Sequence, residues 1–401
     1  MINVVGLGYV GLPTALMMAS HGIEILGTDC NERLINNLAG KKARFNERGM
    51  DCIYQSAMDN GIRFSTDCHK ADAYIIAVPT PYNKETGTID TDYLLSAFSR
   101  IMSVCETGAT VIVESTVTPG TLDNLLRPLL KPGVHLAHAP ERVLPSNIVY
   151  ELQHNNRTIG ADSPIIGEKV RSYYKTFCAG EILVTDIRTA EMSKVVENAF
   201  RAVNIAFANE LSRICHQANM DVNELIRVCN MHPRVQILNP GAGVGGHCIG
   251  VDPWFLVEGF PKHAQLTMKA LTVNEDQPRY ILSRIMKIME ENAISDMNRV
   301  GLYGLTYKED VDDIRNSPAL QLLNCLKIEN RPMMKSYDPL VHSSIVDNQM
   351  YNFNSFLNDI DLVVILVKHK HILSNVDKLK GKKLFDCTNA ICTFQNNFYR
   401  L

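Results

Sequence analysis

The sequence predicts an α/β protein with two doubly wound parallel-sheet domains, joined by a central region built on a long helix. Short apolar runs alternate with segments of helical length in the N-terminal part, and the alternation returns towards the C-terminal end. A long stretch without proline or glycine separates the two parts. Because parallel strands need long crossover connections that are usually helical, this alternation favours parallel sheets.

Four strands are expected in the N-terminal part, and a helix over 12–20 follows the first. The third and fourth strands are continuous apolar runs, which is typical of strands buried on both faces of a parallel sheet. The four expected strands are 2–5, 23–27, 73–78 and 110–114.

The middle of the chain is expected to be helical. Residues 189–220 include no proline or glycine, and apolar residues lie almost all round, which indicates a long helix buried on several sides. A shorter helix follows, with Asp221 as its N-cap. The segment 266–292 is largely helical, with a break or kink at Pro278. We expect this region to connect the α/β domains and to form a dimer core.

The C-terminal part is expected to hold a second α/β domain, with a site in the cleft between the two, because interdomain clefts often bind ligands. Its expected strands are 299–305, 361–367 and 383–386. The resulting division is an N-terminal domain, a central helical domain and a C-terminal α/β domain, over 1–185, 186–295 and 296–401.

The composition excludes several classes of protein. Hydrophobic residues make up 46% and charged residues 21%, as in globular proteins with a large core. The net charge of −3 favours neither a nucleic-acid nor a membrane partner. No signal peptide or membrane-length apolar stretch is evident. The 11 cysteines form no C-x-x-C pair, so we expect no metal site, and a reducing cytoplasm as the compartment.

A glycine-rich segment predicts a dinucleotide site. Gly6-Leu7-Gly8-Tyr9-Val10-Gly11 fits G-x-G-x-x-G between an expected strand and an expected helix. Its glycines let the backbone approach a pyrophosphate, while the helix N-terminus offers free N–H groups. Asp29 follows the second strand, where an acid binds ribose hydroxyls. The alternative is a tight turn without a ligand.

Asp29 favours NAD over NADP, because a carboxylate repels the 2′-phosphate of NADP. Arg33 either contacts a phosphate or is a solvated helix residue. Pro79, Thr80 and Thr116 lie at expected strand ends, where open α/β sheets bind ligands. The two threonine hydroxyls donate to cofactor or substrate, or else cap turns.

The segment 239–253 predicts a loop that presents a nucleophile. Four glycines within 241–246 are incompatible with a stable helix or strand, and they bring backbone close to a ligand. Cys248 follows this loop, although a cysteine is by default an inert buried thiol. Asp252 is placed to hold a water or a lysine.

Two further groups of polar residues are candidates. Lys194, Asn198 and Arg201 fall on one helix face at i, i+4 and i+7. Because unpartnered burial of charge is costly, they pair with acids, form an interdomain salt-bridge network or point into a polar cleft. Glu141, on a loop after an expected strand, is a candidate general base or a surface carboxylate.

Taken together, these motifs make the sequence resemble the UDP-glucose/GDP-mannose dehydrogenase family over essentially its whole length. Two short segments indicate the bacterial branch that acts on UDP-N-acetyl-D-mannosamine: 232–235, and 251–255 with His247 before the cysteine. The motifs that carry the resemblance are GLGYVGLP from Gly6, AVPTP from Ala77, ESTVTPGT from Glu114, APERVLP from Ala139, EMSKVVENAFR from Glu191, GVGGHCIGVDPWF from Gly243 and GLTYKEDVDDIRNSPA from Gly304.

The resemblance implies two Rossmann-like domains and an NAD-dependent, four-electron oxidation of a UDP-sugar C6 alcohol to the carboxylate. Cys248 captures the aldehyde as a thiohemiacetal, which is oxidised to a thioester and then hydrolysed by water with help from Glu141. Covalent capture retains a reactive aldehyde between the two hydride transfers. Lys194 serves as acid/base and oxyanion partner, and the other implied catalytic residues are Asp252, Asn198 and Thr116.

The resemblance also implies binding roles. Lys308 binds the UDP phosphates and Arg315 the NAD phosphates, where an arginine can grip phosphate with two N–H groups. Arg234 can come from a partner subunit, so a homodimer or higher homo-oligomer is expected. Residues implied in substrate binding are Arg142, Val143, Lys194, Asn198, Arg201, His232, Arg234, Gly245 and Lys308; those for NAD are Gly6, Gly8, Tyr9, Val10, Gly11, Asp29, Arg33, Pro79, Thr80, Thr116 and Arg315.

Three departures from the family pattern leave the chemistry in place. Thr388 stands where the family often has a basic residue, Ser146-Asn147 where glycine is usual, and Gly241-Ala242-Gly243 for Gly-Pro-Gly. The alternatives are UDP-N-acetylglucosamine, UDP-glucose or UDP-N-acetylgalactosamine as substrate, a two-electron 3-hydroxyacid dehydrogenase, and a non-catalytic dinucleotide-binding regulator. The product is expected to enter a bacterial capsule or another surface polysaccharide.

Overall fold

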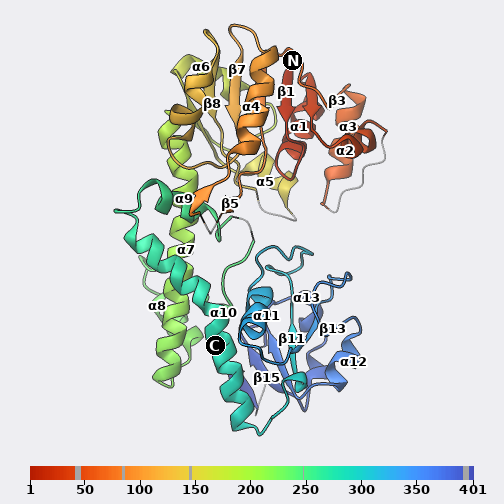
Figure 1. The fold of residues 1–401 in the computed structure, drawn as a ribbon, viewed down its shortest axis with the longest axis vertical. Helices are drawn as coiled ribbons and strands as arrows, with labels where there is room; N and C mark the ends of the chain where they lie inside the picture. Colours follow the sequence, from red (N-terminus) through yellow and green to blue (C-terminus); the bar gives the residue numbers. More distant parts are fainter. Residues whose placement is uncertain (41–46, 84–85, 144–146, 247, 392–396) are drawn as a thin grey trace. The chain divides into compact units, whose positions relative to one another are not determined.

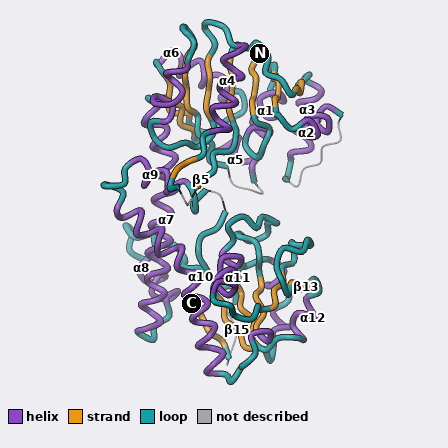
Figure 2. Tube along the Cα trace, in the orientation of Figure 1, coloured by secondary structure: helices purple, strands orange, loops and turns teal. Residues whose placement is uncertain are grey.

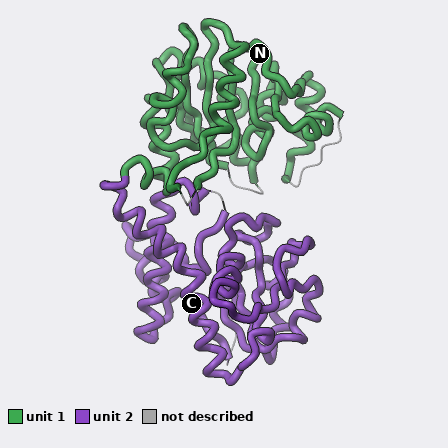
Figure 3. The backbone as a smooth tube through the Cα atoms, in the orientation of Figure 1, with its two compact units in different colours: residues 1–197, 254–260 green, residues 198–253, 261–401 purple. Residues whose placement is uncertain are grey.

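The computed structural model describes residues 1–40, 47–83, 86–143, 147–246, 248–391 and 397–401. The chain forms two compact units (Figure 3). The first comprises 1–197 and 254–260, and the second 198–253 and 261–401. Each unit holds one large sheet with helices around it (Figure 2).

The first unit is built on an eight-stranded sheet in the order β10-β9-β8-β7-β4-β1-β2-β3. The strands run parallel, as predicted, except that β9 is antiparallel to β8. The strand order reverses between β1 and β4, and open α/β sheets bind ligands outside such a reversal. The strands are β1 (Ile2–Val5), β2 (Ile25–Thr28), β3 (Arg63–Ser65), β4 (Ala73–Ile76), β7 (Thr110–Val113), β8 (His135–His138), β9 (Arg157–Ala161) and β10 (Ile182–Thr185).

Helices cover both faces of this sheet (Figure 1). Alternate residues of β4 enter different apolar clusters, Ile75 on one face and Tyr74 and Ile76 on the other, so the sheet is buried on both sides. The remaining elements are α1 (Gly11–Ser20), α2 (Glu32–Ala39), α3 (Met50–Asp59), the hairpin β5 (Tyr82–Asn83) and β6 (Thr88–Ile89), α4 (Asp92–Val104), η1 (Leu122–Leu126), η2 (Arg127–Leu129), α5 (Ile148–His154) and α6 (Pro164–Lys175).

The second unit holds a fully parallel sheet of six strands in the order β13-β12-β11-β14-β15-β16. Apolar clusters again lie on both of its faces. The elements are η3 (Met297–Arg299), β11 (Val300–Tyr303), α11 (Pro318–Ile328), β12 (Lys335–Tyr337), β13 (Gln349–Met350), α12 (Phe353–Asn358), β14 (Leu362–Ile365), α13 (Lys370–Leu373), η4 (Val376–Leu379), β15 (Lys383–Asp386) and β16 (Phe398–Arg400).

Four helices make up the predicted helical region: α7 (Ile187–Gln217), α8 (Val222–Cys229), α9 (Asp252–Gly259) and α10 (Gln265–Glu291). Asp221 caps α8 as predicted, accepting hydrogen bonds from the N–H groups of Asn223 and Glu224. Of the predicted break or kink at Pro278, the break does not occur: α10 continues through this buried proline. The missing N–H removes one intrahelical hydrogen bond, and packing on both sides retains the helix.

Helix α7 is less buried than its apolar sequence predicts. Phe200, Phe207 and Ile214 are 68%, 48% and 53% exposed, while Ala202 and Ala206 are buried. The three exposed residues recur every seven positions and therefore lie along one face. No helix among the described residues has both the length and the apolarity needed to cross a membrane.

Candidate active site

The glycine-rich loop joins β1 to α1, as predicted. Gly6 has φ +92° and its N–H donates to the Thr28 carbonyl at 2.8 Å. A Cβ on Gly11 would collide with the Gly6 carbonyl oxygen, so only glycine permits this turn. Gly8 and Tyr9 are exposed at the tip. The ends of the loop are thus fixed by close contacts, while its tip is exposed next to the strand-order reversal.

Asp29 is tied to this loop. One carboxylate oxygen accepts a hydrogen bond from the Leu7 N–H at 2.8 Å, and the other from the Asn31 N–H at 2.8 Å. Each carboxylate oxygen has a further lone pair, so Asp29 can still accept ribose hydroxyls. Arg33 is exposed at the second position of α2. The loop and Asp29 therefore have the arrangement that dinucleotide-binding sites require.

The loops after β4 and β7 lie together, since these strands are neighbours. The Thr80 hydroxyl donates to the Thr116 carbonyl at 2.7 Å, and the Ser115 hydroxyl donates to the Val78 carbonyl at 2.7 Å. The Thr80 proton therefore supports the turn, which agrees with the structural alternative for this hydroxyl. Pro79 is exposed beside it.

Glu141 belongs to a buried ionic cluster and is not a surface carboxylate. It follows β8, is 8% exposed, and forms an ion pair with Arg157 of β9. Its other oxygen accepts a hydrogen bond from the Arg142 N–H at 2.6 Å. These contacts fix the orientation of the carboxylate.

A second carboxyl group shares the same arginine. Glu114 lies 3.8 Å from Arg157 and accepts a hydrogen bond from the Tyr174 hydroxyl at 2.8 Å. Burial raises the pKa of Glu114 to about 7, although Arg157 opposes the shift and Glu141 adds to it. Arg157 and Tyr174 were not among the predicted site residues; an arginine at the start of an otherwise apolar strand is the sequence signal for a buried acidic partner.

The Arg142 side chain is committed to neighbouring groups. Its guanidinium makes two hydrogen bonds with Glu197, at 2.8 and 2.7 Å, and another with Thr158 at 3.0 Å. A ligand at this loop would therefore meet the backbone of Arg142 and the half-buried Val143 before the guanidinium. The motif residues 144–146 lie outside the described residues.

The polar face of α7 is buried over its first part. Lys194 and Asn198 are both buried, whereas Arg201 is exposed. The Asn198 side-chain amide donates to Asp252 at 2.6 Å, and Asp252 is the first residue of α9. The structure thus joins two predicted catalytic residues that are 54 positions apart.

The cysteine loop is irregular, as predicted, and Cys248 is half-buried at its end. The Cys248 carbonyl accepts hydrogen bonds from the N–H groups of Val251 and Asp252, at 3.0 and 2.8 Å. Cys248 and Asp252 are therefore held in one turn at the start of α9. His247 lies outside the described residues.

Residues from the loop after β11 contact the cysteine loop: Tyr307 packs against Gly245 and Gly246, and the Arg315 carbonyl accepts a hydrogen bond from the Gly246 N–H at 2.9 Å. Burial and Asp313 raise the pKa of Tyr307, with a smaller contribution from Cys248. The Arg315 guanidinium donates to Asp313 at 2.9 Å, and this contact raises the pKa of Arg315, with a smaller contribution from Cys248. Lys308 is half-buried next to Tyr307.

The remaining predicted residues lie on turns. His232 and Arg234 are exposed after α8, and the Arg234 N–H donates to the His232 ring at 3.3 Å. Thr388 donates its hydroxyl to Asp386 at 2.9 Å, so it stabilises the turn after β15 and carries no charge.

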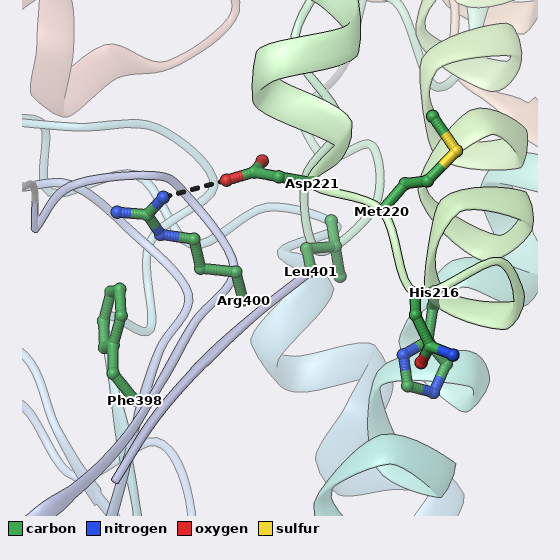
Figure 4. A pocket seen from close by; sticks show the side chains of 7 residues that line it. His216, Met220, Asp221, Phe398, Arg400 and Leu401 are labelled. Atoms are coloured by element: carbon green, nitrogen blue, oxygen red, sulfur yellow. Dashed lines mark hydrogen bonds and ion pairs between the residues drawn. The ribbon is translucent and has the colours of Figure 1, made fainter. Parts of the chain in front are cut away.

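One pocket lies apart from these residues (Figure 4). It has a volume of about 420 Å³ and includes an ion pair of 3.1 Å between Arg400 and Asp221. Its lining residues are His216, Asn219, Met220, Asp221, Phe398, Arg400 and Leu401, none of which the sequence analysis assigned to the site. Among the described residues, no cluster of histidine, cysteine and acidic side chains is suited to a metal ion.

A glycine-rich loop at the strand-order reversal, with an acid after the next strand, defines a dinucleotide-binding domain. The chain belongs to the UDP-glucose/GDP-mannose dehydrogenase family: the family's NAD-binding domain matches 1–178, its central domain 188–276 and its UDP-binding domain 301–393. It is therefore an NAD-dependent nucleotide-sugar dehydrogenase.

Similar proteins cover nearly the whole chain. The UDP-N-acetyl-D-mannosamine dehydrogenase of Methanococcus maripaludis is 37% identical, over 97% of this chain and 93% of that protein. The NDP-N-acetyl-D-galactosaminuronic acid dehydrogenase of Ralstonia nicotianae is 38% identical, over 96% and 95%. The solved structure of the UDP-N-acetyl-mannosamine dehydrogenase Cap5O from S. aureus is 39% identical, with a TM-score of 0.88, covering 100% of this chain and 98% of that one.

Proposed function

We propose that the chain oxidises UDP-N-acetyl-D-mannosamine to UDP-N-acetyl-D-mannosaminuronate, with Cys248 as the nucleophile. The observation that carries this proposal is the turn that holds Cys248 and Asp252 together, with Asn198 bonded to Asp252. Relatives named for this substrate, similar over nearly their whole length, support the choice of sugar.

The residues divide the reaction into capture and hydrolysis. Bound NAD would supply the hydride acceptor for each of the two oxidations, that of the C6 alcohol and that of the thiohemiacetal. The Cys248 sulfur adds to the C6 aldehyde to give a thiohemiacetal, whose oxidation leaves a thioester. Water then adds to the thioester, the C–S bond breaks, and the carboxylate leaves with the thiol restored. The net reaction consumes one water and two molecules of NAD per uronate.

We assign the proton transfers to buried groups. Lys194 takes the proton of the C6 hydroxyl and stabilises the oxyanion, while Glu141 orients and deprotonates the water. Asp252 assists, with Asn198 and Thr116 completing the set. The ion pair with Arg157 and the hydrogen bond from the Arg142 N–H fix the orientation of the Glu141 carboxylate, which supports its role as a base.

We further propose that the glycine-rich loop and Asp29 bind NAD, and that Lys308 binds the diphosphate of the substrate. Arg315 binds NAD phosphates, and Arg33 lies where a phosphate contact is possible. The other proposed cofactor contacts are Tyr9, Val10, Pro79, Thr80 and Thr116; the other proposed substrate contacts are Arg142, Val143, Lys194, Asn198, Arg201, His232, Arg234 and Gly245.

The proposal includes three domains, over 1–185, 186–295 and 296–401, and the three family matches support these bounds. It also includes a homodimer or higher homo-oligomer. The exposed apolar stripe of Phe200, Phe207 and Ile214 supports such an assembly, because apolar side chains repeated along one helix face favour helix pairing.

We propose a cytoplasmic location and a surface polysaccharide as the destination of the product. No disulfide joins the cysteines among the described residues, which supports a reducing compartment. The relative from Ralstonia nicotianae makes the galactose-configured N-acetyl sugar the second candidate substrate.

The test is to incubate wild-type and Cys248→Ala protein with NAD and each of four UDP-sugars: N-acetylmannosamine, N-acetylglucosamine, N-acetylgalactosamine and glucose. We expect two NADH per uronate, turnover that is fastest with N-acetylmannosamine, and no uronate from the variant. One NADH per product, or undiminished uronate from the variant, would contradict the thioester mechanism. Fastest turnover with another sugar would replace the substrate and keep the mechanism.

A further inference from the structure

Two glycines shortly before Cys248, Gly245 and Gly246, pack tightly against one side chain, that of Tyr307. A Cβ on Gly245 would come within 2.6 Å of the Tyr307 Cβ and 2.8 Å of the Asn316 carbonyl oxygen. A Cβ on Gly246 would come within 2.9 Å of the Tyr307 ring, and Gly246 also has φ +79°. Real Cβ atoms do not approach other atoms so closely. The loop is therefore shaped to fit Tyr307.

Hydrogen bonds fasten the same loop to the same segment. The Gly246 N–H donates to the Arg315 carbonyl at 2.9 Å, and the Asn316 side-chain amide donates to the Gly246 carbonyl at 3.1 Å. Gln321 donates to the Val244 carbonyl at 3.3 Å. Both backbone polar groups of Gly246 are thus engaged by residues that follow Tyr307.

Tyr307 is itself anchored to the sheet of the second unit. Its N–H donates to the Asp313 carbonyl at 3.0 Å. The two residues before it, Leu305 and Thr306, donate their N–H groups to the buried Asp338 carboxylate, at 2.7 and 3.2 Å. Hydrogen bonds therefore hold the segment that carries the Tyr307 side chain, and this side chain in turn packs against the cysteine loop.

We propose that Tyr307 is a positioning residue for Cys248. The Tyr307 ring fixes the position and orientation of the loop that presents the Cys248 thiol. This inference rests on the proposed role of Cys248 as nucleophile. It also links the proposed diphosphate site to the reacting sulfur, because Lys308 is adjacent to Tyr307 in one hydrogen-bonded loop. The phenol hydroxyl has no part in the proposal.

The first experiment compares Tyr307→Ala with Tyr307→Phe, which keeps the ring. We expect Tyr307→Ala to lower kcat on the order of 10- to 100-fold, since a nucleophile misplaced by about 1 Å costs this much. UDP affinity, measured by calorimetry, should change less than about threefold, and Tyr307→Phe should stay near wild type. Equal losses in both variants would assign the effect to the hydroxyl and overturn the proposal.

The second readout is independent of turnover. The rate of Cys248 alkylation by iodoacetamide, followed by peptide mass spectrometry without substrate, should change several-fold in Tyr307→Ala and stay unchanged in Tyr307→Phe. An unchanged rate in a folded Tyr307→Ala protein overturns the inference. If Cys248→Ala still makes uronate, the proposed function fails instead, and the alkylation rates still decide the position of the loop.

A double-mutant cycle tests whether Gly246 and Tyr307 act through direct contact or whether each substitution perturbs the fold independently. Gly246→Ala should cost more kcat/KM in the wild type than in Tyr307→Ala, because the smaller residue removes the clash while the backbone strain is the same in both. Additive losses contradict direct contact. Should Tyr307→Ala fail to melt cooperatively, Tyr307→Leu replaces it and retains most of the volume.

Discussion

Arg157 shows at the scale of single residues how one charge governs two acids. It pairs with Glu141 and lies close to Glu114, so the cluster has one cation for two carboxyl groups. Glu114 is the more deeply buried side chain, with one oxygen that has no hydrogen-bond partner among the described residues. A proton on Glu114 therefore leaves Arg157 to pair with Glu141 alone.

This arrangement predicts a pH dependence of stability. The pKa of Glu114 is raised from 4.5 to about 7 in the folded chain, so between these values the folded state holds more protons than the unfolded state. The contribution of Glu114 to the free energy of unfolding must then fall as the pH rises through this window. Glu114→Gln should remove part of the decrease, on the order of 1–3 kcal/mol.

Urea unfolding of wild type and Glu114→Gln at pH 5, 6, 7 and 8 measures this difference. Glu191, whose pKa burial also raises to about 7, contributes to the slope of both proteins and cancels in the comparison. The exposed Glu181→Gln serves as a control and should follow the wild type. Parallel curves for wild type and Glu114→Gln would show that Glu114 does not titrate in this window.

At the scale of elements, residues 254–258 of α9 pack on the hairpin after β4. Trp254 stacks on Tyr82 of β5, with ring centroids 5.7 Å apart and planes 13° apart. Glu258 accepts hydrogen bonds from the Ile89 N–H of β6 at 3.3 Å and the Thr118 hydroxyl at 2.9 Å. One short helix thus starts at Asp252 and packs on the segments that follow Pro79 and Thr116.

Trp254 is the single tryptophan of the chain and should report cofactor binding. Because its partner Tyr82 follows the proposed NAD contacts Pro79 and Thr80, NAD should change the tryptophan fluorescence with the same Kd that calorimetry gives. Tyr82→Leu removes the stacking partner and should reduce the change while NAD still binds. A fluorescence signal that is constant up to saturating NAD would contradict a link between the hairpin and the cofactor.

At the scale of the whole molecule, α7 exposes a row of large apolar side chains on one face. Phe200, Phe207 and Ile214 recur at seven-residue spacing, and alanines lie on the buried side. Burial of about three such side chains contributes several kcal/mol per subunit to association. This surface accounts for the proposed homo-oligomer.

Phe207→Glu should therefore shift the assembly to monomer, because a charge would be buried in the contact. Sedimentation velocity at micromolar protein checks the mass, and activity should fall with the assembly if Arg234 serves the partner's site. Ile165→Glu, at an 81% exposed position on α6, is the matched control and should leave the mass unchanged. A wild-type protein that sediments as a monomer would remove the proposed interface.

Much of this molecule could be predicted from local sequence. The glycine loop, Asp29, the cysteine loop and the N-cap Asp221 all depend on neighbours within a few tens of residues, whose spacing is visible in the chain. The strands 73–76 and 110–113 could be predicted because they are buried on both faces, so their sequences are continuous apolar runs. Only their ends were predicted too long, where the chain turns into ligand-binding loops.

Tertiary structure alone decided the environment of the acting groups. Arg157 of β9 meets Glu114, which follows β7 two strands away, Asn198 meets Asp252, and Tyr307 meets Gly245; each pair is separated by more than 40 positions. No periodicity in a single sequence links such residues, because their contact results from strand order and helix packing. The chain alone therefore determined which reaction class it can support, whereas the fold decided the charge, orientation and support of each group, because burial and long-range contacts set these properties.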